Sequence, residues 1–105
     1  MAKQEILTEV LHIPKTGELA GSTTAAQMPD VQCRMVMFKA HADNSGNVYI
    51  GASTVTVADG VTDITTGFQL DAGDPSPWLL VPNLNKLFRI SDNAGDDLTY
   101  IALQD

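Results

Sequence analysis

Two histidines, one cysteine and several clusters of aspartate and asparagine are the side chains of this 105-residue chain that could do chemistry. A nucleophile needs a base within reach, and only His12 and His41 could act as that base. We expect both on the surface or rim. Cys33 alternates with apolar neighbours and is expected to pack as a small hydrophobic side chain. No Gly-x-Ser-x-Gly, Walker-type or Gly-x-Gly-x-x-Gly pattern is present, so we predict neither enzymatic activity nor a cofactor.

Oxygen ligands are crowded into two turn clusters, residues 43–47 and 92–97. Calcium loops use the same residue types, but neither cluster has the spacing or the terminal bidentate glutamate of a helix–loop–helix site. Hairpin turns recruit Gly, Asn and Asp for backbone reasons alone. We interpret both clusters as structural turns, with weak calcium binding as the alternative. Asp71 and Asp74 are likewise expected to form a turn and not an acid–base pair.

Trp78 is the only tryptophan and begins an apolar segment, residues 78–81, that lies between Pro77 and Pro82. Prolines at both ends confine such a segment to a sheet edge or a strand terminus. We favour a core position for Trp78, at one end of the sandwich, with a contact with another subunit as the main alternative. A third possibility is a carbohydrate-binding module that uses Trp78 and Tyr49, although few aromatic residues remain once a core is filled.

The net charge of the chain limits the classes of partner that it can bind. Six Lys and Arg residues stand against 13 Asp and Glu, a net charge of −7, which repels phosphate backbones and anionic lipid. We therefore expect neither a nucleic-acid nor a membrane partner. The longest apolar runs have four residues, and Lys3 is followed by polar residues, so we expect no membrane span and no secretory signal. The single cysteine excludes an internal disulfide, and we expect folding in a cytoplasm.

Turn clusters separate short segments rich in β-branched and aromatic residues, a pattern typical of an antiparallel sandwich or barrel. The strands expected are residues 31–40, 48–57 with a bulge or bend near Ser53 and Thr54, 66–70, 78–81, 84–90 and 98–103. In the first of them Met35 and Met37 share one face while Val36 and Phe38 share the other, so we expect a central strand packed on both sides. We predict an all-β fold, an antiparallel β-sandwich or jelly-roll-like barrel of about seven to eight short strands.

The chain is divided at residue 30 into an N-terminal arm, residues 1–30, and a single β-domain, residues 31–105. Residues 5–13 fit both a helical stripe and a strand face; we favour a strand that ends at Pro14. Residues 15–29 are small and polar, with little to bury, and are expected to be mobile in the free protein. The candidate subunit contacts are Ile6, Leu7, Val10, Leu11, Ile13 and Trp78.

The order of the pieces from residue 23 to residue 103 resembles a group of small structural proteins of tailed bacteriophages. The pieces are residues 23–26 (Thr-Thr-Ala-Ala), 29–33 (Pro-Asp-Val-Gln-Cys), 38–40 (Phe-Lys-Ala), 46–51 (Gly-Asn-Val-Tyr-Ile-Gly), 67–74, 83–88 and 100–103. The resemblance implies a virion component of the head decoration (cement) type. It marks positions in the fold and no catalytic residues.

The function expected is thus that of a non-enzymatic capsid decoration subunit, made in the host cytoplasm and located in the virion. Its partners would be the major capsid protein or another virion protein, together with copies of itself, a trimer being favoured. An extended arm could add a strand to a neighbour's sheet, and a closed oligomer would protect sheet edges. The alternatives are a tail, neck or fibre-associated subunit and the carbohydrate-binding module.

Overall fold

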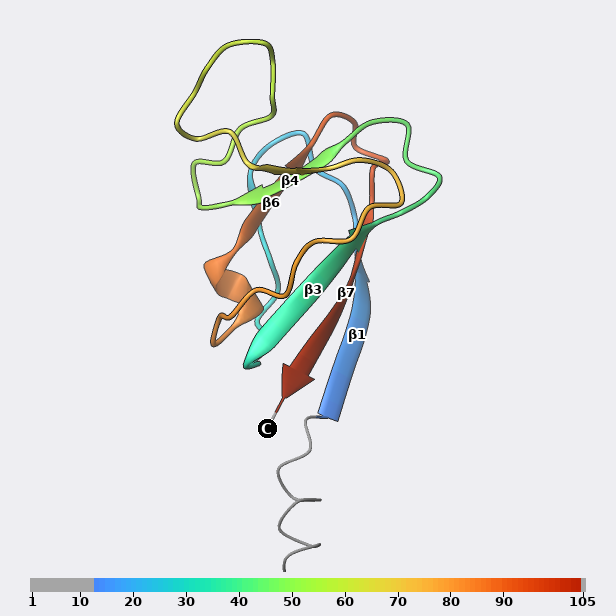
Figure 1. The fold of residues 1–105 in the computed structure, drawn as a ribbon, viewed down its shortest axis with the longest axis vertical. Helices are drawn as coiled ribbons and strands as arrows, with labels where there is room; N and C mark the ends of the chain where they lie inside the picture. The colour runs from blue at the N-terminus through green and yellow to red at the C-terminus, as the bar shows by residue number, and fades with distance from the viewer. Residues whose placement is uncertain (1–12, 105) are drawn as a thin grey trace, which may run out of the picture.

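Short β-branched and aromatic segments pair into two antiparallel sheets (Figure 1). The computed structural model describes residues 13–104, and within this range it holds seven strands and one 3₁₀ turn. This confirms the prediction of an all-β fold with antiparallel sheets. The elements are β1 (Ile13–Leu19), β2 (Ala26–Gln27), β3 (Met35–Ala40), β4 (Val48–Gly51), β5 (Phe68–Leu70), η1 (Leu84–Lys86), β6 (Phe88–Ser91) and β7 (Leu98–Gln104).

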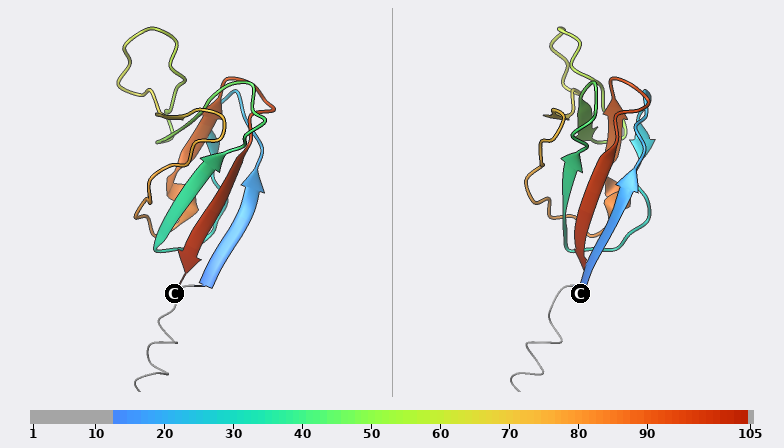
Figure 2. Two further views of the ribbon diagram at one scale, coloured as in Figure 1. Left: turned by 45° about the vertical axis from the view of Figure 1, so that its right-hand side comes forward. Right: turned by 90° about the vertical axis from the view of Figure 1, so that its right-hand side faces the viewer.

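Sheet A has the order β1-β7-β3 and sheet B the order β2-β6-β4-β5. Figure 2 shows β1, β7 and β3 lying side by side along most of their length. Both sheets contribute to one hydrophobic core, because residues of one parity in each long strand point inward. The innermost side chains include Val36, Phe38, Val48, Leu70, Leu98 and Ala102. The fold is therefore a two-layer sandwich.

A proline-rich segment, residues 73–82, lies along the free edge of β3; we call it the edge segment. Val36 and Leu79 exchange two backbone hydrogen bonds, of 2.9 and 2.8 Å, and the N–H of Cys33 donates to Pro82. The prediction that prolines confine residues 78–81 to an edge is confirmed. The strand expected there is reduced to isolated bridges, because Pro77 and Pro82 cannot donate to a ladder.

The bend expected near Ser53 and Thr54 is also present. β4 ends at Gly51, and the backbone N–H of Val55 donates to the carbonyl of Ala52 to close a turn. The chain then leaves sheet B and returns only at β5. Residues 52–67, which we call the long loop, project beyond the sheets (Figure 1, yellow-green). The phase slip between Val48 and Val55 therefore marks an exit from the sheet.

Three sequence expectations for the first thirty residues need correction. Pro14, expected to end a strand, instead lies inside one: β1 begins at Ile13, runs to Leu19 and pairs with β7 over seven residues. The strand favoured for residues 5–13 otherwise lies outside the described residues. Pro14 is tolerated because β1 is an edge strand. Residues 15–29 are also not short of apolar side chains to bury, since Leu19 and Met28 are in the core. From residue 13 onward the expected arm is thus part of the sandwich.

Polar contacts hold the connection between β1 and β3 against β6 and β7. The Nε of Arg89 donates to the carbonyl of Ala20, and its Nη1 donates to that of Gln27. Ser91 binds Ser22 through both its backbone N–H and its hydroxyl. Burial lowers the pKa of the Arg89 guanidinium below its ordinary value. The expectation of a mobile segment overlooked these partners, all more than 60 residues away in sequence.

The strand predicted for residues 84–90 begins late. Leu84–Lys86 form the 3₁₀ turn η1, and only Phe88–Ser91 are extended. Asn83 is the cause, because its side-chain oxygen accepts hydrogen bonds from the N–H groups of Asn85 and Val31. The expected strand at 31–40 is likewise shortened to Met35–Ala40. The candidate contacts Ile6, Leu7, Val10 and Leu11, and His12, lie outside the described residues, as does the side chain of Ile13.

Candidate functional site

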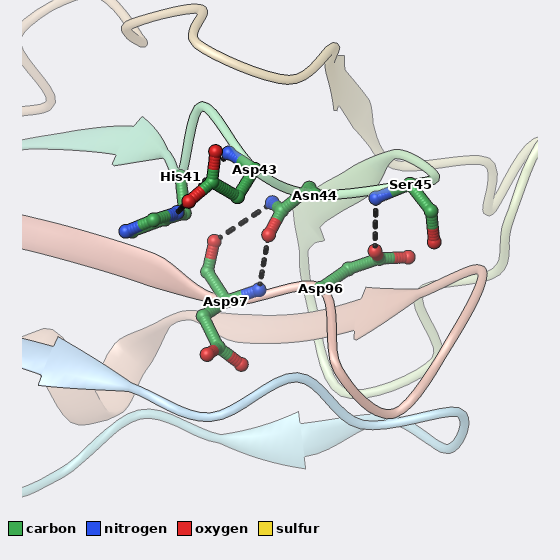
Figure 3. Close-up of polar contacts among 6 residues, drawn as sticks. All are labelled: His41, Asp43, Asn44, Ser45, Asp96 and Asp97. Atoms are coloured by element: carbon green, nitrogen blue, oxygen red, sulfur yellow. Dashed lines mark hydrogen bonds and ion pairs between the residues drawn. The ribbon is translucent and has the colours of Figure 1, made fainter.

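The two turn clusters that could have bound calcium are packed against each other. The carboxylate of Asp96 lies between them: its Oδ1 accepts the backbone N–H groups of Ser45 and Gly46, both at 3.1 Å. Its Oδ2 accepts the backbone and side-chain N–H groups of Asn93, at 2.9 and 3.0 Å. Figure 3 shows the contact with Ser45. Both carboxylate oxygens are thus directed at N–H donors, an arrangement that fixes turns and does not coordinate a cation.

Asp96 is 1% exposed. Burial alone would raise its pKa, but the hydrogen bonds from Gly46, Asn93 and Ser45 outweigh burial and lower the pKa below its ordinary 3.8. The carboxylate therefore stays ionised at neutral pH. A buried carboxylate with four donors stabilises the loops as long as it is charged.

A second pair joins the same turns. Asn44 and Asp97 form a reciprocal contact in which the Nδ2 of Asn44 donates to the carbonyl of Asp97, at 2.9 Å, and its Oδ1 accepts the backbone N–H, at 2.8 Å (Figure 3). The backbone N–H of Asn47 donates to the carboxylate of Asp92. The interpretation of both clusters as structural turns fits this network.

The other titratable candidates are dispersed. His41 is exposed, and its Nδ1 accepts the backbone N–H of Asp43 at 3.1 Å and lies 4.0 Å from the carboxylate (Figure 3). Asp71 and Asp74 belong to a turn in which the N–H of Asp74 donates to the carbonyl of Asp71. Gly73 gives that turn its positive φ of 84°. These residues hold local turns and are not brought together.

Cys33 lines a hollow of about 430 Å³ with Gln32, Arg34, Pro82 and Gln104. The thiol donates to the carbonyl of Val81 at 3.2 Å, and burial raises its pKa above the ordinary 9.0. A raised pKa keeps the thiol protonated and weakly nucleophilic at neutral pH. Cys33 also packs against the hydrophobic core, as its sequence pattern predicts.

Two absences concern the described residues alone. Between residues 13 and 104, no group of three or more His, Cys, Asp or Glu side chains is arranged to hold a metal ion. Over the same range no helix has the length and apolar character of a membrane span.

Trp78 is placed outward by a bulge in the edge segment. The N–H of Ser76 donates to the carbonyl of Phe38, and that of Leu79 to the carbonyl of Val36. Three steps along the edge segment therefore match two steps along β3, which leaves one extra residue at Pro77 or Trp78. Trp78 is 42% exposed. The interpretation of Trp78 as a core residue is wrong, and the subunit contact stays a prediction.

The sugar-stacking pair of Trp78 and Tyr49 is also wrong, because Tyr49 is 2% exposed. Tyr49 lies in the centre of β4, between β5 and β6, and its ring is inaccessible to a ligand. Trp78 would have to stack on a sugar without that partner. Protein-bound sugars usually need more than one such platform.

The sequence did not single out two further exposed apolar residues, Val61 and Ile64 at the tip of the long loop. Ile64 is fully exposed and Val61 nearly two-thirds exposed. Hydrogen bonds hold the stem below them. The backbone N–H of Thr56 donates to the carbonyl of Thr65, the hydroxyls of the two threonines bond to each other, and Val55 is buried. In the sequence, only the Asp59-Gly60 turn followed closely by Val61 and Ile64 indicates this tip.

An apolar groove lies between the β4–β5 pair of sheet B and the edge segment. It has a volume of about 210 Å³ and is lined mainly by Ile50, Phe68, Pro77, Leu79 and Leu87. Exposed apolar side chains are thus concentrated on the long loop, the adjoining β5 and the edge segment. We take these elements as the candidate contact surface. Comparison of the chain with family models, curated proteins and solved structures finds no match.

Proposed function

We propose that this chain is a non-enzymatic structural protein of a tailed-phage virion, a decoration subunit that binds the assembled head. The observation that carries the proposal is the long loop, which presents Val61 and Ile64 to solvent on a hydrogen-bonded stem. Large exposed aliphatic side chains on a small acidic domain are typical of a docking surface. The order of sequence pieces from residue 23 to residue 103 supports the virion setting.

The loop tip has a definite chemical character. Asp59 precedes the two aliphatic residues and Asp63 lies between them, and Gly60 takes a positive φ of 87° that turns the tip. A surface complementary to it would have an apolar depression with cations at its rim. Such a polar rim around an apolar centre favours specific and correctly oriented docking. We infer that the loop tip inserts between subunits of the shell.

The direct test is the copy number of the protein in purified particles, measured by mass spectrometry against the major capsid protein. A number that scales with the shell lattice supports a decoration subunit. One ring of copies would place the protein at the neck or tail instead, and absence from particles would refute the virion assignment.

A binding test isolates the loop. Ile64→Ser is expected to lower occupancy on undecorated heads by about tenfold at limiting protein, since about 1.5 kcal/mol of apolar burial is lost. Thr62→Ser, in the same loop, is the matched control and should bind like the parent. Deletion of residues 1–12 tests the arm without removing β1. Equal occupancy for parent and Ile64→Ser would rule out the loop as the anchor.

A further inference from the structure

The outer face of sheet A carries an apolar stripe that no described residue covers. Register places Met35 beside Leu103 and Met37 beside Ile101. All four have the parity opposite to that of the core residues Val36, Phe38, Tyr100 and Ala102, so their side chains project from the outer face. They are half-buried by one another, and a shallow hollow of about 240 Å³ lies between Met37, Lys39, Thr99 and Ile101.

The edge segment extends this stripe. Val36 and Leu79 form a hydrogen-bonded pair whose side chains both point into the core. The residues on either side of Leu79 must therefore point outward, which places Trp78 and Leu80 on the outer face next to Met37 and Met35. Leu80 is 79% exposed. The outer face thus presents six large apolar side chains over three adjacent chain segments, the edge segment, β3 and β7.

Two residues of opposite charge lie on the same face, at equivalent positions on either side of the central strand β7. Glu18 on β1 and Lys39 on β3 both stand opposite Thr99 of the central strand. The two charges are separated by two strand spacings, about 10 Å. Both are exposed, and within residues 13–104 no ion pair joins either of them to another side chain. An acidic and a basic side chain therefore lie equidistant from β7, on opposite sides.

We propose that this face binds a second copy of the chain, with a two-fold axis that runs along β7 between the two outer faces. Rotation about that axis exchanges the β1 side with the β3 side. Glu18 of one copy then faces Lys39 of the other, twice, and Ile101 packs against its own symmetry mate. Leu103 also meets its own symmetry mate, whereas Met35 and Met37 of each copy face Pro14 and Thr16 on β1 of the other. The contact is thus self-complementary in charge.

Charge complementarity is what favours a second copy over another protein. Sheets that pack face to face do so over side chains of this kind, at about 10 Å separation. The area that the two copies share is small: about 14 Å across the three strands of sheet A and about 20 Å along them, or roughly 300 Å² for each copy. This lies below the standard interface size, so the dimer is expected to be weak and concentration-dependent.

Sedimentation of the full chain over about 10 μM to 1 mM tests the proposal. We expect monomer and dimer in exchange, with Glu18→Lys and Lys39→Glu each weakening dimerisation about tenfold or more, because each creates two like-charge contacts. The double variant Glu18→Lys/Lys39→Glu should restore the parent affinity. Restoration is decisive, since a merely structural effect of either change would not be reversed by the other.

The controls change charge away from the face. Asp63→Lys on the long loop and Lys86→Glu on η1 alter net charge equally and should leave dimerisation unchanged. Met37→Gln should weaken it with both charges in place. A monomer at every concentration, a trimer, or a double variant no tighter than the single variants would overturn the proposal. The outcome is independent of the virion assignment, which is tested on particles.

Discussion

The buried carboxylate of Asp96 accepts the backbone N–H of Ser45, 51 residues earlier in the chain, at 3.1 Å. Through this contact the turn between β3 and β4 is held against the turn between β6 and β7. The first of these turns passes from sheet A to sheet B and the second returns. The contact therefore fixes the two sheets relative to each other at one end of the sandwich.

Replacement of Asp96 by Asn should destabilise the fold by about 2–3 kcal/mol, because charge-assisted hydrogen bonds are lost and an amide N–H₂ is turned toward the two donors of Asn93. Equilibrium urea unfolding measures this. Asp92→Asn is the matched control. Asp92 is exposed and accepts only one described hydrogen bond, from Asn47, so its loss should cost much less. Equal costs for the two variants would contradict a special role of Asp96.

Acid should remove this contribution in a definite window. The folded pKa of Asp96 lies below its unfolded value of about 3.8, so the unfolded chain takes up the proton first as pH falls. The stability that the carboxylate supplies is thus complete above about pH 4 to 5 and is lost as pH falls through the folded pKa. Urea unfolding of the parent and of Asp96→Asn at pH 7, 4, 3 and 2.5 should show a difference that narrows toward acid. A difference that widens toward acid would mean that the pKa of Asp96 is higher in the folded than in the unfolded chain.

Gly21→Ala should also destabilise the protein, by about 1–3 kcal/mol. A Cβ at Gly21 would collide with the backbone carbonyl oxygen of Asp96, and backbone cannot move aside as a side-chain tip can. Gly95→Ala is the control in the adjoining turn, since a Cβ there meets nothing within 4 Å. Thermal unfolding of both variants separates close packing from a general intolerance of alanine in these turns. Equal melting temperatures would argue against the close approach.

The sequence predicts those features of the fold whose physical cause lies within a few neighbouring residues. Val36 and Phe38 were expected on one face because alternation is a local property, and both are in the core. β1 was not expected, because Pro14 and Gly17 interrupt its pattern. Position 17 requires glycine because Tyr100 on β7 lies against it: a Cβ at Gly17 would be 2.8 Å from the ring of Tyr100. That reason lies 83 residues away and is invisible to periodicity.

The candidate site shows the same division. Proline chemistry placed Trp78 on an edge, but its exposure depends on a bulge set by the pairing of Ser76 with Phe38. The two apolar faces of the strand at Met35 and Met37 predicted a central strand packed on both sides, and this is wrong: β3 is the edge strand of sheet A, and its outer face has no described cover. Polar turns were recognised from composition, whereas their mutual packing through Asp96 required the tertiary structure.

The thiol of Cys33 should react slowly with iodoacetamide in the folded protein. Burial raises its pKa above 9.0, and only the thiolate is the nucleophile. The alkylation rate should rise with pH toward a midpoint above 9 and should increase at pH 8 when urea unfolds the chain. Mass spectrometry of the quenched reaction follows both. A folded rate equal to the unfolded rate would show that the thiol is neither buried nor held by Val81.

Trp78 reports on the proposed contact, because it is the only tryptophan and is 42% exposed in the single chain. Dilute protein should therefore show emission that acrylamide quenches efficiently. If the outer face of sheet A pairs with a second copy, Trp78 lies at the margin of the contact, and quenching should fall as protein concentration rises. Glu18→Lys should keep Trp78 quenchable at concentrations where the parent is protected, and the double charge reversal should protect it again. Quenching that is the same at all concentrations would mean that Trp78 lies outside any contact between copies.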